Sequence, residues 1–261
     1  MQLLTRSIAD ELRRVLAPPH HAAAPELPAH TEAGVLVALY LDDLHAGVDD
    51  LHAGVDDLHA GVDYLRPGLD DLHVVLTRRR EDLRHHPGEI SFPGGRREEG
   101  EYDLCATALR EAEEEIGLPA HAVEIVGTLA PATTVATGYV IHPFVGMIEP
   151  GRTWTLSANE VAEVIKVPVR ELRCGYARRR LIRHGLHRPP RIPIRTDTYL
   201  AGERLIWGAT ARILTDLLQR LQPNRGASGG RPLPAPAGAE SSQPFSIGTP
   251  TKLPHSVHEP S

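Results

Sequence analysis

The chain has 261 residues, of which 41% are hydrophobic, so it is long and apolar enough for one large domain or two small ones. Its formal net charge of −6 argues against a whole-chain attraction to nucleic acid, and its two cysteines, Cys105 and Cys174, predict neither a disulfide framework nor a zinc cluster. We therefore expect a cytoplasmic protein that does not bind nucleic acid.

Hydrophobic periodicity predicts the first elements of the chain. Residues 3–16 have the amphipathic spacing of a helix, which the following proline-rich segment ends. Residues 34–41, GVLVALYL, form a short apolar run rich in branched side chains, which predicts a buried strand. Because this run is too short to cross a bilayer as a helix, we expect no membrane segment. A second apolar run at 74–77, VVLT, predicts the next strand.

A heptapeptide repeat separates these two strands. DDLHAGV begins in perfect copy at Asp42, Asp49 and Asp56, and a decayed copy completes residues 42–69. Its leucine and valine spacing is that of a coiled coil, but each perfect copy carries a glycine that costs a helix about 1 kcal/mol relative to alanine. Removing 42–69 rejoins the two strands through a tight turn. We therefore interpret the repeat as an insertion in a hairpin loop, in preference to a dimerising helix or a histidine metal site.

The remaining elements alternate between strands and helices. Strands are predicted at residues 123–130, 139–148 and 160–169. Residues 173–195, dense in arginine and proline, predict a loop, 198–207 predict a hairpin, and 209–221 predict a helix with one apolar face. The result is a mixed α/β domain over 1–222, followed by a Pro, Gly and Ser-rich tail at 223–261 that we expect to be disordered.

The most unusual stretch, ALREAEEEIGL at 108–118, crowds glutamates on one helix. Glu111, Glu114 and Glu115 project together, whereas the apolar residues between them fall on another face. Three carboxylates on a sheltered face cannot all stay ionised unless a cation joins them, and oxygen-only ligands select Mg²⁺ or Mn²⁺. Taken alone, the stretch fits a solvated acidic surface equally well.

The neighbouring residues favour the metal site. In the preceding segment ISFPGG, Gly94 and Gly95 allow a sharp turn and a close backbone approach, and the Gly95 carbonyl is a candidate ligand of the same metal. Arg110 can hold the Glu111 carboxylate in one orientation by a bidentate contact.

Residues 95–118 resemble the Nudix box, G-x5-E-x7-R-E-U-x-E-E-x-G-U, in which U is aliphatic. The matching positions are Gly95, Glu101, Arg110, Glu111, Ala112, Glu114, Glu115, Gly117 and Leu118. Two features depart from the pattern, because Ala112 is small and eight residues rather than seven separate Glu101 from Arg110. The longer spacing is that of one branch of the family, the coenzyme A pyrophosphatases.

A second signature of that branch, L-L-T-x-R-[SA]-x3-R-x3-G-x-[VI]-x-F-P-G-G, resembles residues 75–95, VLTRRREDLRHHPGEISFPGG. Leu76, Thr77, Arg79, Arg84, Gly88, Ile90, Phe92, Pro93, Gly94 and Gly95 match in register. Arg80 departs, since Ser or Ala is usual there. The resemblance implies a Nudix-type α/β/α sandwich with a mixed β-sheet and a loop-helix-loop metal site. It also implies metal-dependent hydrolysis of coenzyme A, or its thioesters, to 3′,5′-ADP and 4′-phosphopantetheine.

The resemblance assigns roles to individual residues. Glu114 and Glu115 are expected to be metal ligands, and Glu111 is either a ligand or the general base. Glu101 is expected to act through a second metal or through Arg110. A later carboxylate, Glu160 or Glu163, is a candidate addition to the site.

The substrate of that branch carries three phosphates, so cationic contacts are needed. Arg79 and Arg84, together with Gly94, are the expected substrate contacts, with surface ion pairing as the alternative for the arginines. Two other functions remain open: a Nudix hydrolase acting on ADP-ribose, NADH or an oxidised nucleotide, and a Nudix-fold binding protein without catalysis. The second is disfavoured because all the box carboxylates are present. The sequence does not predict acyl-chain preference, the physiological metal or the oligomeric state.

Overall fold

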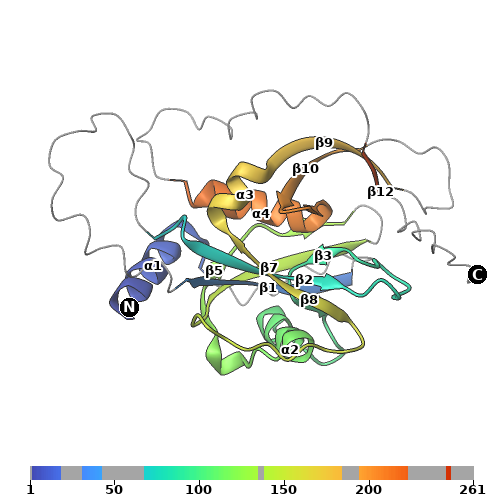
Figure 1. Cartoon of the computed structure of the whole chain (residues 1–261). Helices are drawn as coiled ribbons and strands as arrows, with labels where there is room; N and C mark the ends of the chain where they lie inside the picture. Colours follow the sequence, from blue (N-terminus) through green and yellow to red (C-terminus); the bar gives the residue numbers. More distant parts are fainter. Residues whose placement is uncertain are drawn as a thin grey trace, which may run out of the picture.

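A mixed β-sheet forms the middle layer of the protein (Figure 1). The computed structural model describes residues 2–18, 31–42, 68–134, 138–183, 194–222 and 245–247. Strand β1 (Thr31–Leu41) pairs in parallel with β7 (Tyr139–Met147) and antiparallel with β2 (Leu72–Arg79). On the outer sides, β8 (Val161–Pro168) pairs with β2, and β5 (Glu124–Thr128) pairs with β7, both antiparallel.

Strands β1 and β2 diverge after a short paired stretch. They pair through three residues of each strand, with Leu39 opposite Val74 and Leu41 opposite Leu72. Further along, β4 (Gly94–Arg96) pairs with the start of β1, and β3 (Ile90–Ser91) pairs with the end of β2. The segment that contains Phe92 and Pro93 therefore lies between the two diverging strands, in the middle of the sheet. A further short strand, β6 (Ala132–Thr133), pairs with β7.

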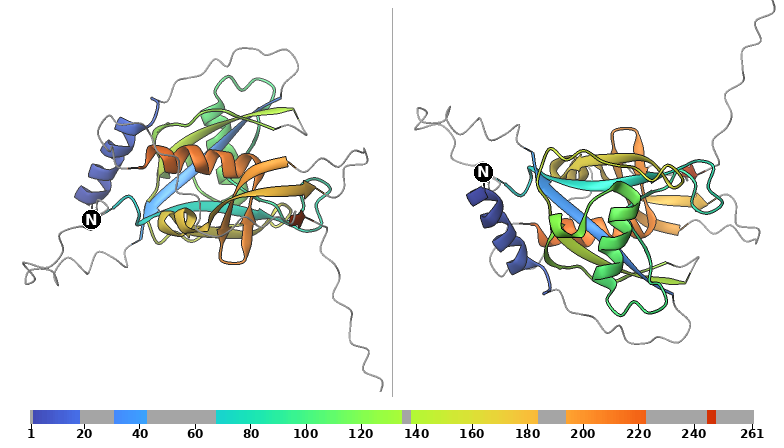
Figure 2. Two further views of the ribbon diagram at one scale, coloured as in Figure 1. Left: turned by 90° about the horizontal axis from the view of Figure 1, so that it is seen from above. Right: turned by 90° about the horizontal axis from the view of Figure 1, so that it is seen from below.

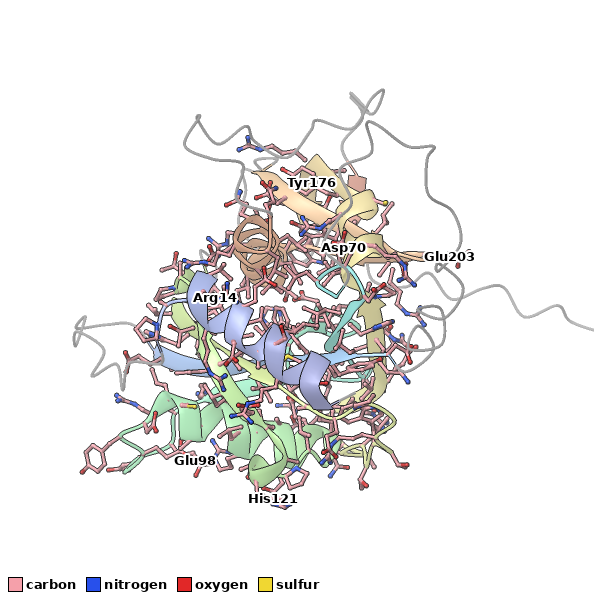
Figure 3. The ribbon with its side chains drawn as sticks, turned by 90° about the vertical axis from the view of Figure 1, so that its left-hand side faces the viewer. Arg14, Asp70, Glu98, His121, Tyr176 and Glu203 are labelled. Carbon is pink, nitrogen blue, oxygen red and sulfur yellow. The ribbon has the colours of Figure 1, made fainter. Side chains whose placement is uncertain are left out.

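Helices cover both faces of the sheet (Figures 1 and 2). Helix α2 (Leu104–Ile116), followed by the 3₁₀ turn η3 (Ala120–Ala122), packs on one face. The other face carries α1 (Gln2–Val15), α3 (Val169–Gly175) and α4 (Gly208–Arg220), with a second sheet of β9 (Tyr176–Arg183), β10 (Ile194–Ala201) and β11 (Arg204–Ile206). Figure 3 shows these two sides, with Glu98 on the side of α2 and Tyr176 on the side of the second sheet.

The core consists of one apolar cluster on each face of the sheet. Along β1, Leu36 and Ala38 belong to the cluster under α2, whereas Val37 and Leu39 belong to the cluster under α4. A strand with both faces buried has a continuous apolar sequence, which explains the run at 34–41. The expected α/β/α sandwich with a mixed β-sheet is confirmed, as are the helices at 3–16 and 209–221 and the hairpin at 198–207.

The prediction of a loop over 173–195 is wrong for residues 173–183 and for residues 194–195, which begin β10, and residues 184–193 lie outside the described residues. Residues 173–175 end α3, and β9 then pairs antiparallel with β10. The strand is stabilised by distant partners: the Tyr176 hydroxyl donates to Asp197 at 2.9 Å, and the Thr198 hydroxyl donates to the Ala177 carbonyl at 2.7 Å. Arginine density within a local window carries no information about such cross-strand contacts.

Two predicted segments lie largely outside the described residues. Residues 43–67 of the repeat are among them, although the antiparallel pairing of β1 with β2 is that expected for a hairpin. The last residues of the repeat region belong to the fold, because Gly68 lies against Ile8 and Leu69 packs against the core. Within 223–261 the structure describes β12 (Phe245–Ile247), which pairs in parallel with β9.

Deleting two complete heptapeptides, Asp49–Val62, is expected to leave the melting temperature within a few degrees of that of the full chain. This cut keeps Asp42, Gly68 and Leu69, and shortening a loop changes its closure entropy by only about 0.6 kcal/mol per halving of length. Differential scanning calorimetry measures the stability, and light scattering measures the mass. A change in subunit number would support the dimerising helix instead.

Candidate active site

Hydrogen bonds fix both ends of helix α2. Its N-cap, Asp103, accepts a hydrogen bond from the Cys105 main-chain N–H at 2.9 Å. Its C-cap, Gly117, has a left-handed φ of 69°, and its N–H donates to the Glu113 carbonyl at 2.9 Å. At Gly34 of β1, an added Cβ would lie 2.2 Å from the Leu104 carbonyl oxygen, so this glycine allows the helix to approach the sheet. The Glu111 and Glu115 carboxylates are thereby held beside Gly94 and Gly95 of β4.

Glu101 precedes the helix and holds Arg110 in place. Its carboxylate accepts hydrogen bonds from Arg110 Nε at 2.9 Å, from the Thr107 hydroxyl at 2.8 Å and from the Glu98 N–H at 2.9 Å. The hydrogen bond from Arg110, aided by the other two donors, lowers the pKa of Glu101 to about 2. Of the two expected routes for Glu101, this geometry favours the one through Arg110.

The other arginine nitrogens reach two further carboxylates. Arg110 Nη2 donates to Glu111 at 3.0 Å, and Nη1 donates to Glu114 at 3.1 Å. The Glu111 side chain is 18% exposed, whereas that of Glu114 is 59% exposed. Gly95 lies directly against Glu111, because an added Cβ there would be 2.2 Å from Glu111 Oε1. A side chain at position 95 would therefore displace the Glu111 carboxylate from its present place.

Glu115 is the buried carboxyl group of the site, with 5% of its surface exposed. Burial, followed by the charge of Glu111, raises the pKa of Glu115 to about 8, although the Gly94 N–H at 3.3 Å and the charge of Arg79 act in the opposite direction. Burial also raises the pKa of Glu111. The protein thus confines two carboxyl groups that repel each other when both are ionised.

A loop between β7 and β8 brings one more carboxylate to this group. The Ser157 N–H donates to the Glu115 carbonyl at 2.9 Å, and the charge of Glu160 contributes to the raised pKa of both Glu111 and Glu115. Glu163 lies elsewhere, because it accepts hydrogen bonds from Arg78 and Arg204. Of the two later carboxylates expected from the sequence, Glu160 is therefore the one near the site.

The expected substrate contacts occupy different environments. Arg79 is close enough to Glu115 to lower its pKa, and its Nε is buried without a hydrogen-bond partner among the described residues. Arg84 is exposed on the loop after β2, and no contact joins it to the carboxylates in the part of the chain that the structure describes. Gly94 has a φ of 152° and lies against Val35 of β1, where a side chain would clash.

The oxygen atoms at this site are of the chemical type that binds a hard divalent cation. Carboxylate oxygens and a nearby glycine carbonyl are the ligands that such ions prefer, and a cation would favour the ionised form of Glu115, whose pKa is raised by burial and by the charge of Glu111. In the described residues no three His, Cys, Asp or Glu side chains are arranged as a ready metal cage. Arg110 donates hydrogen bonds to both Glu111 and Glu114. The residues therefore fit a metal, with Glu115 and Glu111 as the buried members.

One cleft of the described structure lies away from the carboxylates. A cleft of about 110 Å³ is lined by Tyr40, Trp154 and Lys166, among other residues. Tyr40 lies six residues beyond Gly34 on β1, which places the cleft about 20 Å along the strand from the β4 pairing. The cleft is therefore separate from the carboxylate site.

Comparison with known proteins places the chain in a family. A family model of the NUDIX domain matches residues 59–184. The protein named "uncharacterized Nudix hydrolase NudL" of Photorhabdus laumondii subsp. laumondii is 37% identical over 151 residues, which cover 57% of this chain and 77% of that protein. The chain belongs to the Nudix hydrolase family. The protein of the same name from Citrobacter koseri is 36% identical over 149 residues, covering 55% and 72%. The solved MutT/nudix family protein from Enterococcus faecalis is 15% identical with a TM-score of 0.40, covering 80% and 71%.

As a Nudix pyrophosphohydrolase, the protein acts on small nucleoside diphosphate derivatives, and enzymes of this family generally use divalent metal ions. The described part of the chain contains no helix with the length and apolarity needed to cross a membrane.

Two polar residues near the site were given no role from the sequence alone. Thr107 holds Glu101, which no local pattern indicates. Arg80 contacts the Glu160 loop, and its departure from the second signature was the available signal.

Proposed function

We propose that this Nudix hydrolase cleaves the pyrophosphate bond of coenzyme A or its thioesters, giving 3′,5′-ADP and 4′-phosphopantetheine. The observation that carries the proposal is the location of the second signature. Its residues, 75–95, run from β2 to β4 and include both Arg79 and Gly94. Both of these residues act on Glu115. The signature that distinguishes this branch is thus built into the wall of the candidate site.

Arg79 supplies the cationic contact that a phosphate-rich substrate requires. Its Nε–H is buried and makes no hydrogen bond to the described residues, which is costly unless a ligand accepts from it. A pyrophosphate oxygen is a suitable acceptor, since arginine binds phosphate oxygens through charge-assisted hydrogen bonds. Gly94 and Gly95 lack side chains, which allows the backbone of β4 to lie against Val35 and against the Glu111 carboxylate.

The carboxylates are proposed to bind the metal ion and to activate water. Glu115 and Glu111, with the Gly95 carbonyl and Glu114, are the proposed ligands of Mg²⁺ or Mn²⁺, which when bound neutralises charge on the pyrophosphate oxygens. Glu111 also remains a candidate general base for the attacking water. Glu101 orients Arg110, which in turn orients Glu111, so these two residues position the carboxylate without needing to touch substrate.

A substrate panel tests the proposal. Purified protein is incubated with Mg²⁺ and, separately, with coenzyme A, acetyl-coenzyme A, ADP-ribose, NADH and oxidised nucleotides, and the products are identified by mass. We expect the highest kcat/KM for coenzyme A or its thioester, with 3′,5′-ADP as a product. A higher kcat/KM for ADP-ribose, NADH or an oxidised nucleotide would replace the proposal with that substrate, and turnover of none would favour a binding protein.

Arg84→Ala is expected to lower kcat/KM for coenzyme A more than for ADP-ribose, by about 10-fold for a lost charged contact. Arg84 is exposed and lies in the signature of this branch, which leaves it available to a phosphate that ADP-ribose lacks. The comparison of kcat/KM for the two substrates is the measurement. Equal losses on both would instead make Arg84 a shared phosphate contact or a structural residue.

A further inference from the structure

Arg80 occupies the position of the second signature where Ser or Ala is usual, and its side chain has defined partners. Its Nε and Nη2 donate to the two carboxylate oxygens of Asp82, at 2.8 and 2.7 Å. Its Nη1 donates to the Ala158 carbonyl at 2.5 Å. Its main-chain N–H donates to the Glu160 carbonyl at 3.0 Å. One residue at the end of β2 therefore contacts two residues of the loop that carries Glu160.

The same loop is attached to α2 on its other side. The Ser157 N–H donates to the carbonyl of Glu115, and the Glu160 N–H donates to the carbonyl of Ser157 at 3.1 Å. The loop 157–160 thus bridges the helix that carries the carboxylates and the strand that carries Arg79. Its only side-chain hydrogen bond among the described residues comes from Arg80.

We infer that Arg80 is a positioning residue, which holds the Ala158 carbonyl and thereby fixes the loop that carries Glu160 between α2 and β2. The bidentate contact with Asp82 orders the guanidinium group before it meets the loop, so less conformational freedom is lost in making the contact. A serine or alanine at position 80 would keep the main-chain hydrogen bond to Glu160 and lose the bridge to Ala158. The inference rests on the proposed carboxylate site and adds a residue that the family signature does not supply.

A competing explanation is that Arg80 and Asp82 form only a surface ion pair. Both side chains are exposed, and exposed pairs of this kind contribute little to stability. The two explanations differ in what happens to the loop. A surface pair leaves residues 157–161 unchanged when Arg80 is replaced, whereas a positioning residue does not.

Amide hydrogen exchange of the metal-free protein distinguishes the positioning residue from the surface ion pair, and it needs no substrate. In Arg80→Ser, the amides of residues 157–161 are expected to exchange about 10-fold faster, the size of effect expected for losing one hydrogen bond from a charged donor. The matched control is Arg170→Ala, which removes another exposed arginine and its hydrogen bond to Asp71, near the opposite end of β2. Unchanged exchange at 157–161 in Arg80→Ser would overturn the inference.

A kinetic double-mutant cycle tests whether Arg80 acts through Glu160. With the best substrate of the panel, Arg80→Ser is expected to lower kcat about 10-fold with KM unchanged, since small displacements of a reacting group cost rate. The double variant Arg80→Ser/Glu160→Gln is expected to be no slower than Glu160→Gln alone. Arg80→Lys should restore part of the rate, because it keeps one charged donor.

Losses that add in the double variant, or an Arg80→Ser enzyme with unchanged kcat, would contradict the inference. A failure of the coenzyme A proposal is distinguishable from this outcome. The exchange experiment uses no substrate, and the cycle uses whichever nucleoside diphosphate derivative the enzyme hydrolyses best.

Discussion

Glu115→Gln is expected to lower kcat about 100-fold or more at saturating Mg²⁺, because it removes charge from the buried centre of the metal site. Glu115 is almost fully buried, accepts from the Gly94 N–H and lies beside Glu111 and Arg79. Glutamine has nearly the same shape, so the fold should persist. Steady-state hydrolysis, together with circular dichroism of the variant, measures the two effects.

The matched control for this prediction is Glu113→Gln. Glu113 lies on the same helix with the same charge, but its side chain is exposed and no contact joins it to the other carboxylates of the described residues. Its replacement should leave kcat within about 2-fold of the unsubstituted enzyme, as for an ordinary surface change. A Glu115→Gln enzyme as active as Glu113→Gln would exclude Glu115 from the metal site.

In the presence of a chelator, the protein is expected to lose stability as the pH rises toward 8. Glu115 has an ordinary pKa of 4.5, which burial raises to about 8 in the folded protein. The folded state therefore binds a proton that the unfolded state has released, and stability is lost as the pH rises between these two values. The slope is at most about 1.4 kcal/mol per pH unit.

Two comparisons isolate the contribution of Glu115. The neutral variant Glu115→Gln should have a flatter dependence of unfolding free energy on pH than the unsubstituted protein, and it should be the more stable of the two at pH 8. Mg²⁺ should raise the melting temperature of the unsubstituted protein more at pH 8 than at pH 6, since binding favours the ionised carboxylate. Identical pH profiles for the two proteins would show that Glu115 is already ionised when buried.

Local patterns predicted the elements whose signals lie within one window of sequence. The run at 34–41 is apolar because both faces of β1 are buried. The spacing of Ala108, Ala112 and Ile116 places them on the face of α2 that packs on the sheet. Glu111 and Glu115 lie at the border of this face, and Glu115 is buried together with the apolar residues. The strand β9 was missed because its partners, Asp197 and Thr198, lie about twenty residues further along the chain.

The choice between Glu160 and Glu163 shows what only the tertiary structure decided. In a regular strand Val161 and Glu163 would share a face. An irregularity in the pairing of β2 with β8 places Val161 opposite Arg79 and Glu163 opposite Arg78. Glu163 therefore points away from α2 and accepts hydrogen bonds from Arg78 and Arg204.

The sequence by itself therefore determined the composition of the site: the carboxylates of α2, the glycines of β4 and the arginines of the second signature. The tertiary structure determined which of these groups meet. Arg110 joins Glu101 to Glu111, Arg79 meets Glu115, and Arg80 reaches the loop of Glu160. These contacts depend on the register between strands and on how far β1 and β2 diverge. Both are set by long-range packing, which no local stretch of sequence encodes.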